Sequence, residues 1–197
     1  INPSLYKKVN FKIEDFTPIA LIGEAPLVLL ANAKLPIKSI NDLVAVGKTK
    51  PDAIRFASSG NGSSSHLAMD VLRHMTGMQY LHIPYRGGGP ALVDVMSGEV
   101  DVTMLPISES MPYVRDGRVI ALGQTGVTRS TIAKDMPTIE EAGVKGYAST
   151  AWYMVLGPAN LPANVVSFMQ TQLAKVLQMP DLRDRVQAAG VNIINGD

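Results

Sequence analysis

The stretch that most constrains the fold is Ala57–Leu67, which reads Ala-Ser-Ser-Gly-Asn-Gly-Ser-Ser-Ser-His-Leu. Residues 53–57, which lead into this stretch, have the alternating apolar pattern of a short strand. Apolar side chains recur at helical spacing after it. A strand that passes through a glycine- and serine-rich turn into a helix leaves unpaired backbone N–H groups at the helix start. The stretch therefore predicts either an anion-binding turn or a plain helix cap with Ser63 or Ser64 as the capping residue.

A second turn of the same character spans Tyr85–Pro90 and contains three consecutive glycines. Glycines before a proline at the first helical position let a ligand reach the backbone, which favours binding over a flexible turn. Arg86 would pair with a ligand carboxylate or point into solvent. Tyr85 would contact the ligand or pack at the strand end. If the glycines serve a ligand, Gly88→Val should abolish binding with little loss of fold.

A third turn, Pro106–Ser108, follows another expected strand. Ligands of α/β sheets bind beyond the carboxyl ends of strands, near the first turns of the following helices. We therefore expect the first two turns to line one concave face. The candidate ligand-binding residues are Ser58, Ser59, Gly60, Asn61, Gly62, Ser63, Ser64, His66, Tyr85, Arg86, Gly87, Gly88 and Gly89.

Strands alternate with helices along the chain, which indicates an α/β fold with largely parallel sheets. Strands are expected at 17–23, 27–31, 53–57, 80–84, 100–105, 119–123, 149–157 and 191–194, with a break at residues 24–26. One helix is expected to follow the cap residue Ser39, with Asp42 at the third position of that helix. Further helices are expected at 63–76, 90–96, 106–116, 136–143, 163–177 and 181–189.

Composition excludes several classes of function. Lys and Arg number 18 against 17 Asp and Glu, which predicts no nucleic-acid surface. No apolar run approaches the roughly 18–20 residues that span a bilayer. The absence of cysteine excludes disulfides, a thiolate metal site and a cysteine nucleophile. Because the chain opens with Ile1 and stops just after residues 191–194, we expect a fragment or a processed product.

The serine run does not match known catalytic or nucleotide-binding templates. The residues Gly62–His66 lack the second glycine of a nucleophile elbow, and the P-loop lysine and Rossmann glycines are missing. His66, His74 and His82 are spaced eight residues apart, so we expect no shared metal site. We expect His66 near the ligand cleft and Asp101 in a structural role.

The sequence resembles the Bug family, the periplasmic solute-binding receptors of tripartite tricarboxylate transporters. The matching motifs run through the chain in order and spacing: Asp15–Ala20, Pro36–Ser39, Ala57–His66, His82–Ala91, Pro137–Gly143, and Trp152 followed by Gly157–Pro158. The Ser-Gly-Asn-Gly and Tyr-Arg-Gly-Gly-Gly-Pro motifs are the most specific of these.

The resemblance implies a type II periplasmic-binding fold. Two lobes, each a mixed and largely parallel sheet flanked by helices, would close on a small carboxylate held mainly by backbone amides and hydroxyls. Residues 27–124 would form lobe two and carry both turns, and residues 1–26 and 125–197 would form part of lobe one. Family members begin with a further segment and end with a further helix, so we expect lobe one to be incomplete and open to self-association.

The resemblance also implies a protein of the periplasm that is not an enzyme and has no cofactor or metal. Its partners would be a di- or tricarboxylate, an amino acid or an aromatic acid, and the membrane permease of the transporter. Two other functions stay open at this point. One is the ligand-sensing effector domain of a bacterial transcription regulator, which shares this fold class. The other is a serine hydrolase, which the failed motif comparisons disfavour.

Overall fold

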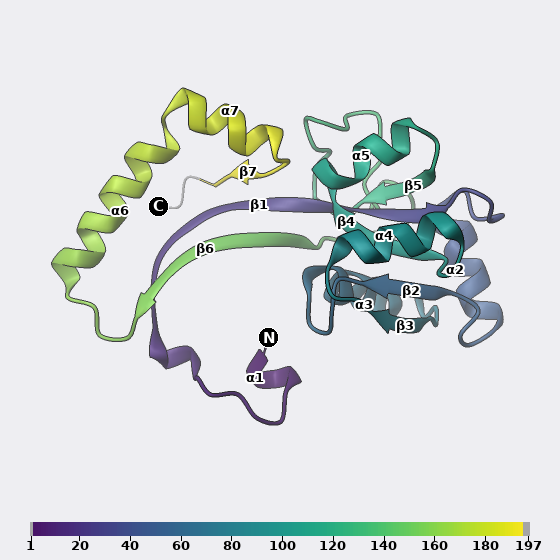
Figure 1. Ribbon diagram of the computed structural model, residues 1–197, viewed down its shortest axis with the longest axis horizontal. Helices are drawn as coiled ribbons and strands as arrows, with labels where there is room; N and C mark the ends of the chain where they lie inside the picture. Colours follow the sequence, from purple (N-terminus) through teal and green to yellow (C-terminus); the bar gives the residue numbers. More distant parts are fainter. Residues whose placement is uncertain (1, 195–197) are drawn as a thin grey trace. The chain divides into compact units, whose positions relative to one another are not determined.

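A computed structural model describes residues 2–194 and confirms the α/β class (Figure 1). The chain divides into two compact units. Unit 1 comprises Ile1–Ala25 and Ala151–Asp197, and unit 2 comprises Pro26–Thr150. Unit 2 begins at Pro26, one residue before the expected start of lobe two at residue 27. It ends at Thr150, well beyond the expected end of lobe two at residue 124.

Residues 125–150 belong to unit 2 because they are bonded to it. The backbone N–H of Thr125 donates to Leu27 O (2.9 Å), and its hydroxyl accepts from the N–H of Leu27 (2.8 Å). The ring of Tyr147 is buried, and its hydroxyl donates to Ala68 O (2.9 Å). Burial raises the pKa of this hydroxyl, which keeps it a donor. The assignment of this segment to lobe one therefore does not match the contacts.

Unit 2 is built on a sheet with strand order β3-β2-β4-β1-β5. The strands are Leu81–Pro84 (β3), Arg55–Ser58 (β2), Val102–Pro106 (β4), Phe16–Asn32 (β1, paired here through residues 27–32) and Val119–Gln124 (β5). Strand β2 pairs in parallel with β3 and β4, while β1 is antiparallel to β4 and β5. The parallel half of the sheet carries the predicted turns.

Strand β1 is continuous through residues 24–26, where we expected a break (Figure 1). The fixed φ of Pro26 is compatible with an extended chain, and a proline lacks only the N–H that a strand pairing would use. The pairing of β1 with β4 begins one residue later, at Leu27 opposite Pro106. The sequence signal of a break therefore marks the point where the pairing partner changes.

Four helices of unit 2 begin at or near the predicted residues: Ile40–Thr49 (α2), Ser64–Thr76 (α3), Gly88–Ser97 (α4) and Ile107–Arg115 (α5). The cap of α2 is as expected, since Ser39 Oγ accepts from the N–H of Asp42 (3.1 Å). The Asp42 carboxylate accepts from the N–H of Lys38 (3.0 Å). The bond from the Lys38 N–H is the largest of the contacts that lower the pKa of Asp42. Buried side chains from the sheet, α4 and α5 form one core cluster, among them Val28, Leu30, Ala57, Leu92, Val95 and Ile107.

Residues 136–143 form turns, and the short helix expected there is absent. Both bonds of a helix cap are present: the N–H of Thr138 donates to Glu141 Oε2 (2.8 Å), and the N–H of Glu141 donates to Thr138 Oγ1 (3.1 Å). However, Thr138 also forms a parallel bridge with Gln124, whose side chain donates to Met136 O (2.7 Å). This attachment to the end of β5 replaces the helix.

Unit 1 contains the first part of β1 with β6 (Thr150–Pro158) and β7 (Asn192–Ile193), both paired with β1. Its helices are α1 (Asn2–Leu5), a short 3₁₀ turn (Ile13–Asp15), α6 (Ala163–Leu177) and α7 (Pro180–Ala188). Helix α6 has the bounds that its periodicity predicts. Within residues 2–194, no helix has the length and apolar character needed to cross a membrane.

Candidate functional site

The three predicted turns leave β2, β3 and β4, which are neighbours in the sheet. Because these strands are parallel, their carboxyl ends meet at one edge. The first two turns touch directly: the N–H of Tyr85 donates to Ser58 O (2.9 Å). A Cβ placed on Gly60 would lie 3.5 Å from Tyr85 O. The structure therefore brings both predicted turns to the same side of unit 2.

Hydroxyl groups hold the first turn together from inside. Ser63 caps α3, because its Oγ accepts from the N–H of His66 (3.3 Å) while its own hydroxyl donates to Gly60 O (2.7 Å). Ser65 Oγ lies 3.0 Å from the hydroxyls of both Ser59 and Ser63 and accepts from the N–H of Ser59 (3.0 Å). The plain helix cap at Ser63 is thus present, and most serine hydroxyls serve the turn itself.

The cap leaves two backbone N–H groups at the start of α3 without a hydrogen-bond acceptor. The N–H of His66 goes to the cap and that of Leu67 to Ser63 O (3.0 Å), so those of Ser64 and Ser65 have no acceptor among residues 2–194. At the start of α4 no side chain caps the helix, and the N–H groups of Gly88 and Gly89 likewise have none within that range. Two adjacent helix starts thus keep donors for an anion.

The predicted site residues differ in exposure. Asn61, Ser64, Arg86 and Gly89 are exposed, and Ser58 is fully buried. The half-buried members are Ser59, Gly60, Gly62, Ser63, His66, Tyr85, Gly87 and Gly88. Exposure of Ser64 and Gly89 leaves these two positions open to a ligand, whereas the side chains of Ser58 and Ser65 are buried and support the turn.

Tyr85 is attached to α4 through its hydroxyl. It donates to Asp94 Oδ2 over 2.6 Å, the short distance of a bond to a charged acceptor. This bond, together with partial burial and the negative charge of Asp94, raises the pKa of Tyr85 to about 12. The hydroxyl is therefore occupied, and Tyr85 fixes the second turn to the helix that follows it.

The glycines of the second turn have separate roles. Gly87 adopts φ of 115°, a conformation that other residues rarely take, and becomes the N-cap of α4. Helix α4 therefore begins at Gly88, two residues before the expected Pro90. A Cβ on Gly88 would lie 2.5 Å from Leu105 Cδ2. A side chain at Gly88 would therefore require Leu105 to move, so Gly88 also serves the packing of the turn against the end of β4.

Sequence reasoning missed one pair at this site. The imidazoles of His66 and His82 stack, with ring centroids 3.9 Å apart and planes at 11°. His82 Nε2 lies 2.6 Å from Ser58 Oγ, and the N–H of Gly62 donates to His66 Nδ1 (3.1 Å). Burial, and then the charge of His66, lower the pKa of His82. A spacing of sixteen residues carries no signal of this contact, which depends on the parallel pairing of β2 with β3.

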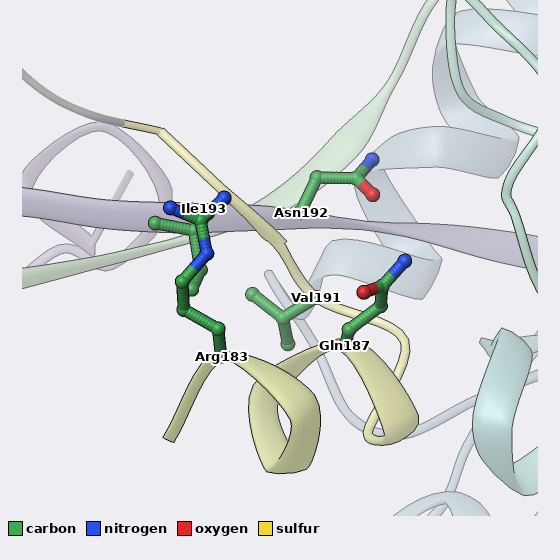
Figure 2. Close-up of a pocket in the computed structure, with 5 residues that line it drawn as sticks. All are labelled: Arg183, Gln187, Val191, Asn192 and Ile193. Carbon is green, nitrogen blue, oxygen red and sulfur yellow. The ribbon is translucent and has the colours of Figure 1, made fainter. Parts of the chain in front are cut away.

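The other chemistry-bearing positions are structural or remote from the turns. Within residues 2–194, no three His, Cys, Asp or Glu side chains gather as a metal site would require. A small polar hollow of about 200 Å³ lies in unit 1. Figure 2 shows Arg183 and Gln187 rising from α7 beside Val191–Ile193. No predicted site residue lines it.

Comparison with known proteins shows which family the chain belongs to. BugT of Bordetella pertussis is 30% identical over 188 residues, which are 95% of this chain and 58% of BugT. Among solved structures, an R. palustris protein with adipate has a TM-score of 0.87 at 29% identity, covering 98% of this chain and 65% of that one. MatC from Rhodopseudomonas palustris with bound malate has a TM-score of 0.84 at 28% identity, covering 98% and 66%.

The chain spans 57–59% of the length of three curated relatives that it matches. The solved neighbours include the periplasmic binding protein BugD, with a TM-score of 0.84 at 29% identity over 98% of this chain and 65% of BugD. Residues 1–197 match the family model described as the tripartite tricarboxylate transporter family receptor. This match extends over the whole chain, and the protein therefore belongs to that receptor family, which includes the Bug proteins.

Proposed function

We propose that this protein is the solute-binding receptor of a tripartite tricarboxylate transporter and that it captures a small carboxylate. The family match favours the receptor over the effector domain of a regulator. The observation that carries the proposal is the pair of adjacent helix starts, where Ser64, Ser65, Gly88 and Gly89 keep N–H groups for an anion. Two solved neighbours contain adipate and malate, which are carboxylates.

The magnitudes support this assignment. A hydrogen bond to a charged acceptor contributes about 1.5–3 kcal/mol, and a helix start adds about 0.3–1 kcal/mol. Four such donors approach the roughly 8 kcal/mol of a micromolar complex before the costs of ordering are subtracted. The two turns therefore supply part of the free energy that holds one carboxylate group without a buried lysine, and contacts from the second lobe would supply the rest.

We propose a binding role rather than an enzymatic one. The arrangement closest to a nucleophile and base is Ser58 Oγ beside His82 Nε2. However, Ser58 is fully buried, and its hydroxyl donates to Gly60 O (3.1 Å). A substrate cannot reach it in this position. Incubation with an activated ester should give no hydrolysis above the uncatalysed rate, and turnover that Ser58→Ala removes would overturn this assignment.

We further propose a periplasmic location and the membrane permease of the transporter as partner, both in keeping with the family. Self-association through unit 1 is a third proposed contact. It is supported by a groove of about 550 Å³ lined by apolar side chains, including Phe11, Ile13, Phe16, Trp152 and Leu156.

Calorimetric titration tests the proposed function directly. We expect malate or adipate to bind, more weakly than to a receptor with both lobes complete, because their carboxylates match the unpaired N–H groups at the two helix starts. Hexane-1,6-diol, the uncharged analogue of adipate, should give no binding heat. Equal binding of the diol would contradict the proposal. Absence of binding heat with either carboxylate at concentrations up to about 10 mM would contradict it as well.

A further inference from the structure

The stacked histidines lie directly beneath the first turn. His66 belongs to the first turn of α3 and His82 to β3, so the stack joins α3 to the strand that pairs with β2. His82 also stacks on Phe56 of β2, with ring centroids 6.0 Å apart. The His66 ring is therefore held in place on one face, and its Nδ1 is fixed toward the backbone of the turn.

The bond made by His66 requires an uncharged ring. Gly62 N–H is the donor in its 3.1 Å bond to His66 Nδ1, so this nitrogen carries no proton. A protonated imidazole has N–H groups at both nitrogens and accepts no hydrogen bond. Protonation of His66 would thus place two donors against each other, and the bond that closes the loop between Gly62 and α3 would be lost.

Other titratable groups lie close to the stacked pair of His66 and His82. Burial would raise the pKa of Asp70, one turn further along α3, but Arg73, then Tyr80 and last the charge of His66 lower it. Asp70 is itself bonded to Arg73 Nε (2.8 Å) and to the hydroxyl of Tyr80 (3.2 Å). The neighbour from β2, Phe56, is uncharged. Burial disfavours a charge on His82 and Asp70 favours one, while two charged rings 3.9 Å apart would repel.

We propose that His66 is a pH-dependent positioning residue: while uncharged it closes the carboxylate-binding turn through Gly62, and its protonation opens the turn and weakens carboxylate binding. This inference rests on the proposed function, because it concerns the same turn. Loss of the half-buried bond between Gly62 and His66 should lower malate affinity about tenfold between pH 8 and pH 5.5.

The test compares malate affinity at pH 8 and pH 5.5 in three proteins. His66→Asn provides an uncharged amide oxygen close to the position of Nδ1, so its profile should be flat apart from the titration of malate itself. His74→Asn is the matched control, since His74 is exposed on the same helix, and it should keep the wild-type profile. The titration of malate is common to all three proteins and cancels in the comparison.

A ligand-free readout separates this inference from the proposed function. In an NMR titration of the unliganded protein, the Gly62 amide should shift with the same midpoint as the His66 ring. The inference is overturned if that amide does not respond, if wild-type affinity rises in acid, or if His66→Asn keeps the wild-type profile. Absence of malate and adipate binding at pH 8 overturns the proposed function, and the Gly62 titration then still decides whether His66 closes the turn.

Discussion

The carboxylate of Asp101 accepts three hydrogen bonds from Arg55: from its backbone N–H (2.7 Å), its Nε (3.0 Å) and its Nη2 (2.8 Å). In return, the N–H of Asp101 donates to Arg55 O (2.9 Å). The Asp101 side chain is only 9% exposed. The two residues thus tie the start of β2 to the start of β4, which are the strands that carry two of the three turns.

Asp101→Asn should therefore destabilise the protein. It removes the charge of a nearly buried carboxylate and leaves the Arg55 guanidinium, which is 40% exposed, without its anion, at a cost of about 1–2 kcal/mol after solvent screening. Urea unfolding monitored by circular dichroism measures this loss. Glu99→Gln is the control, because Glu99 is exposed nearby and should change stability by less than about 0.5 kcal/mol. Equal stabilities of the two variants would contradict the structural role of Asp101.

Tyr85→Phe should destabilise the protein by about 1–2 kcal/mol at neutral pH, because it leaves Asp94 without its donor. The pKa of Tyr85 is raised from 10.0 to about 12. A raised pKa stabilises the fold fully below the unfolded value, and this contribution is lost as pH rises through the folded value. The difference from wild type should thus persist to about pH 10 and fade toward pH 12.

Urea unfolding across this range checks the prediction. Tyr153→Phe serves as the control, since Tyr153 is 45% exposed and its variant should unfold as wild type does at each pH. A deficit for Tyr85→Phe that stays constant up to pH 12 would show that the bond to Asp94 is not its cause.

Gly88→Ala and Gly89→Ala separate packing from exposure within one turn. A Cβ on Gly88 would overlap Leu105 Cδ2, whereas a Cβ on Gly89 would have no heavy atom within 4 Å. Gly88→Ala should cost about 1–3 kcal/mol, and Gly89→Ala should be neutral or stabilising by up to about 1 kcal/mol. Thermal unfolding of the two variants measures the contrast, and the reverse order would refute the packing role of Gly88.

The local features of the fold were predictable from sequence. The cap of α2 at Ser39 and the bounds of α6 follow from short-range patterns that the structure confirms. The cap at Ser63 was one of two stated alternatives, and the structure shows it together with the open N–H of Ser64. These features depend on residues within one turn of each other, where side-chain chemistry decides the geometry.

The rest depends on contacts between distant residues. The stack of His66 on His82 arises from the pairing of β2 with β3, and the need for glycine at Gly88 arises from Leu105 on another strand. The sequence of residues 136–143 has a helix cap, yet the bridge of Thr138 to Gln124 overrides it. Local patterns contain no information about such partners, so they place the turns but not what supports them.

The apolar groove of unit 1 predicts association of this chain with itself. Trp152 is 57% exposed and lines the groove, so contact between copies would remove apolar surface from water. Size-exclusion chromatography with light scattering should give a mass above 21.1 kDa that Trp152→Lys lowers. Phe168→Lys is the control, because Phe168 is 62% exposed and lies outside the groove. A 21.1 kDa monomer at all concentrations would contradict this prediction.

The central claim is that backbone N–H groups at the helix starts bind a carboxylate, and Ser64 allows this to be tested at one atom. Ser64→Pro removes the N–H at the first position of α3, where proline is well tolerated. The preceding Ser63 has φ of −67° and ψ of 163°, which suits a residue before proline. Ser64→Ala is the matched control, because it removes the hydroxyl and keeps the N–H.

The deciding measurement is the calorimetric Kd of malate or adipate for wild type, Ser64→Ala and Ser64→Pro at pH 8. Loss of one N–H bond to a charged group should weaken binding by Ser64→Pro about 10- to 100-fold, with thermal stability unchanged. Ser64→Ala should bind within about threefold of wild type. If Ser64→Pro binds as tightly as Ser64→Ala while wild type binds, the carboxylate is not held at the start of α3, and the account of the site is wrong.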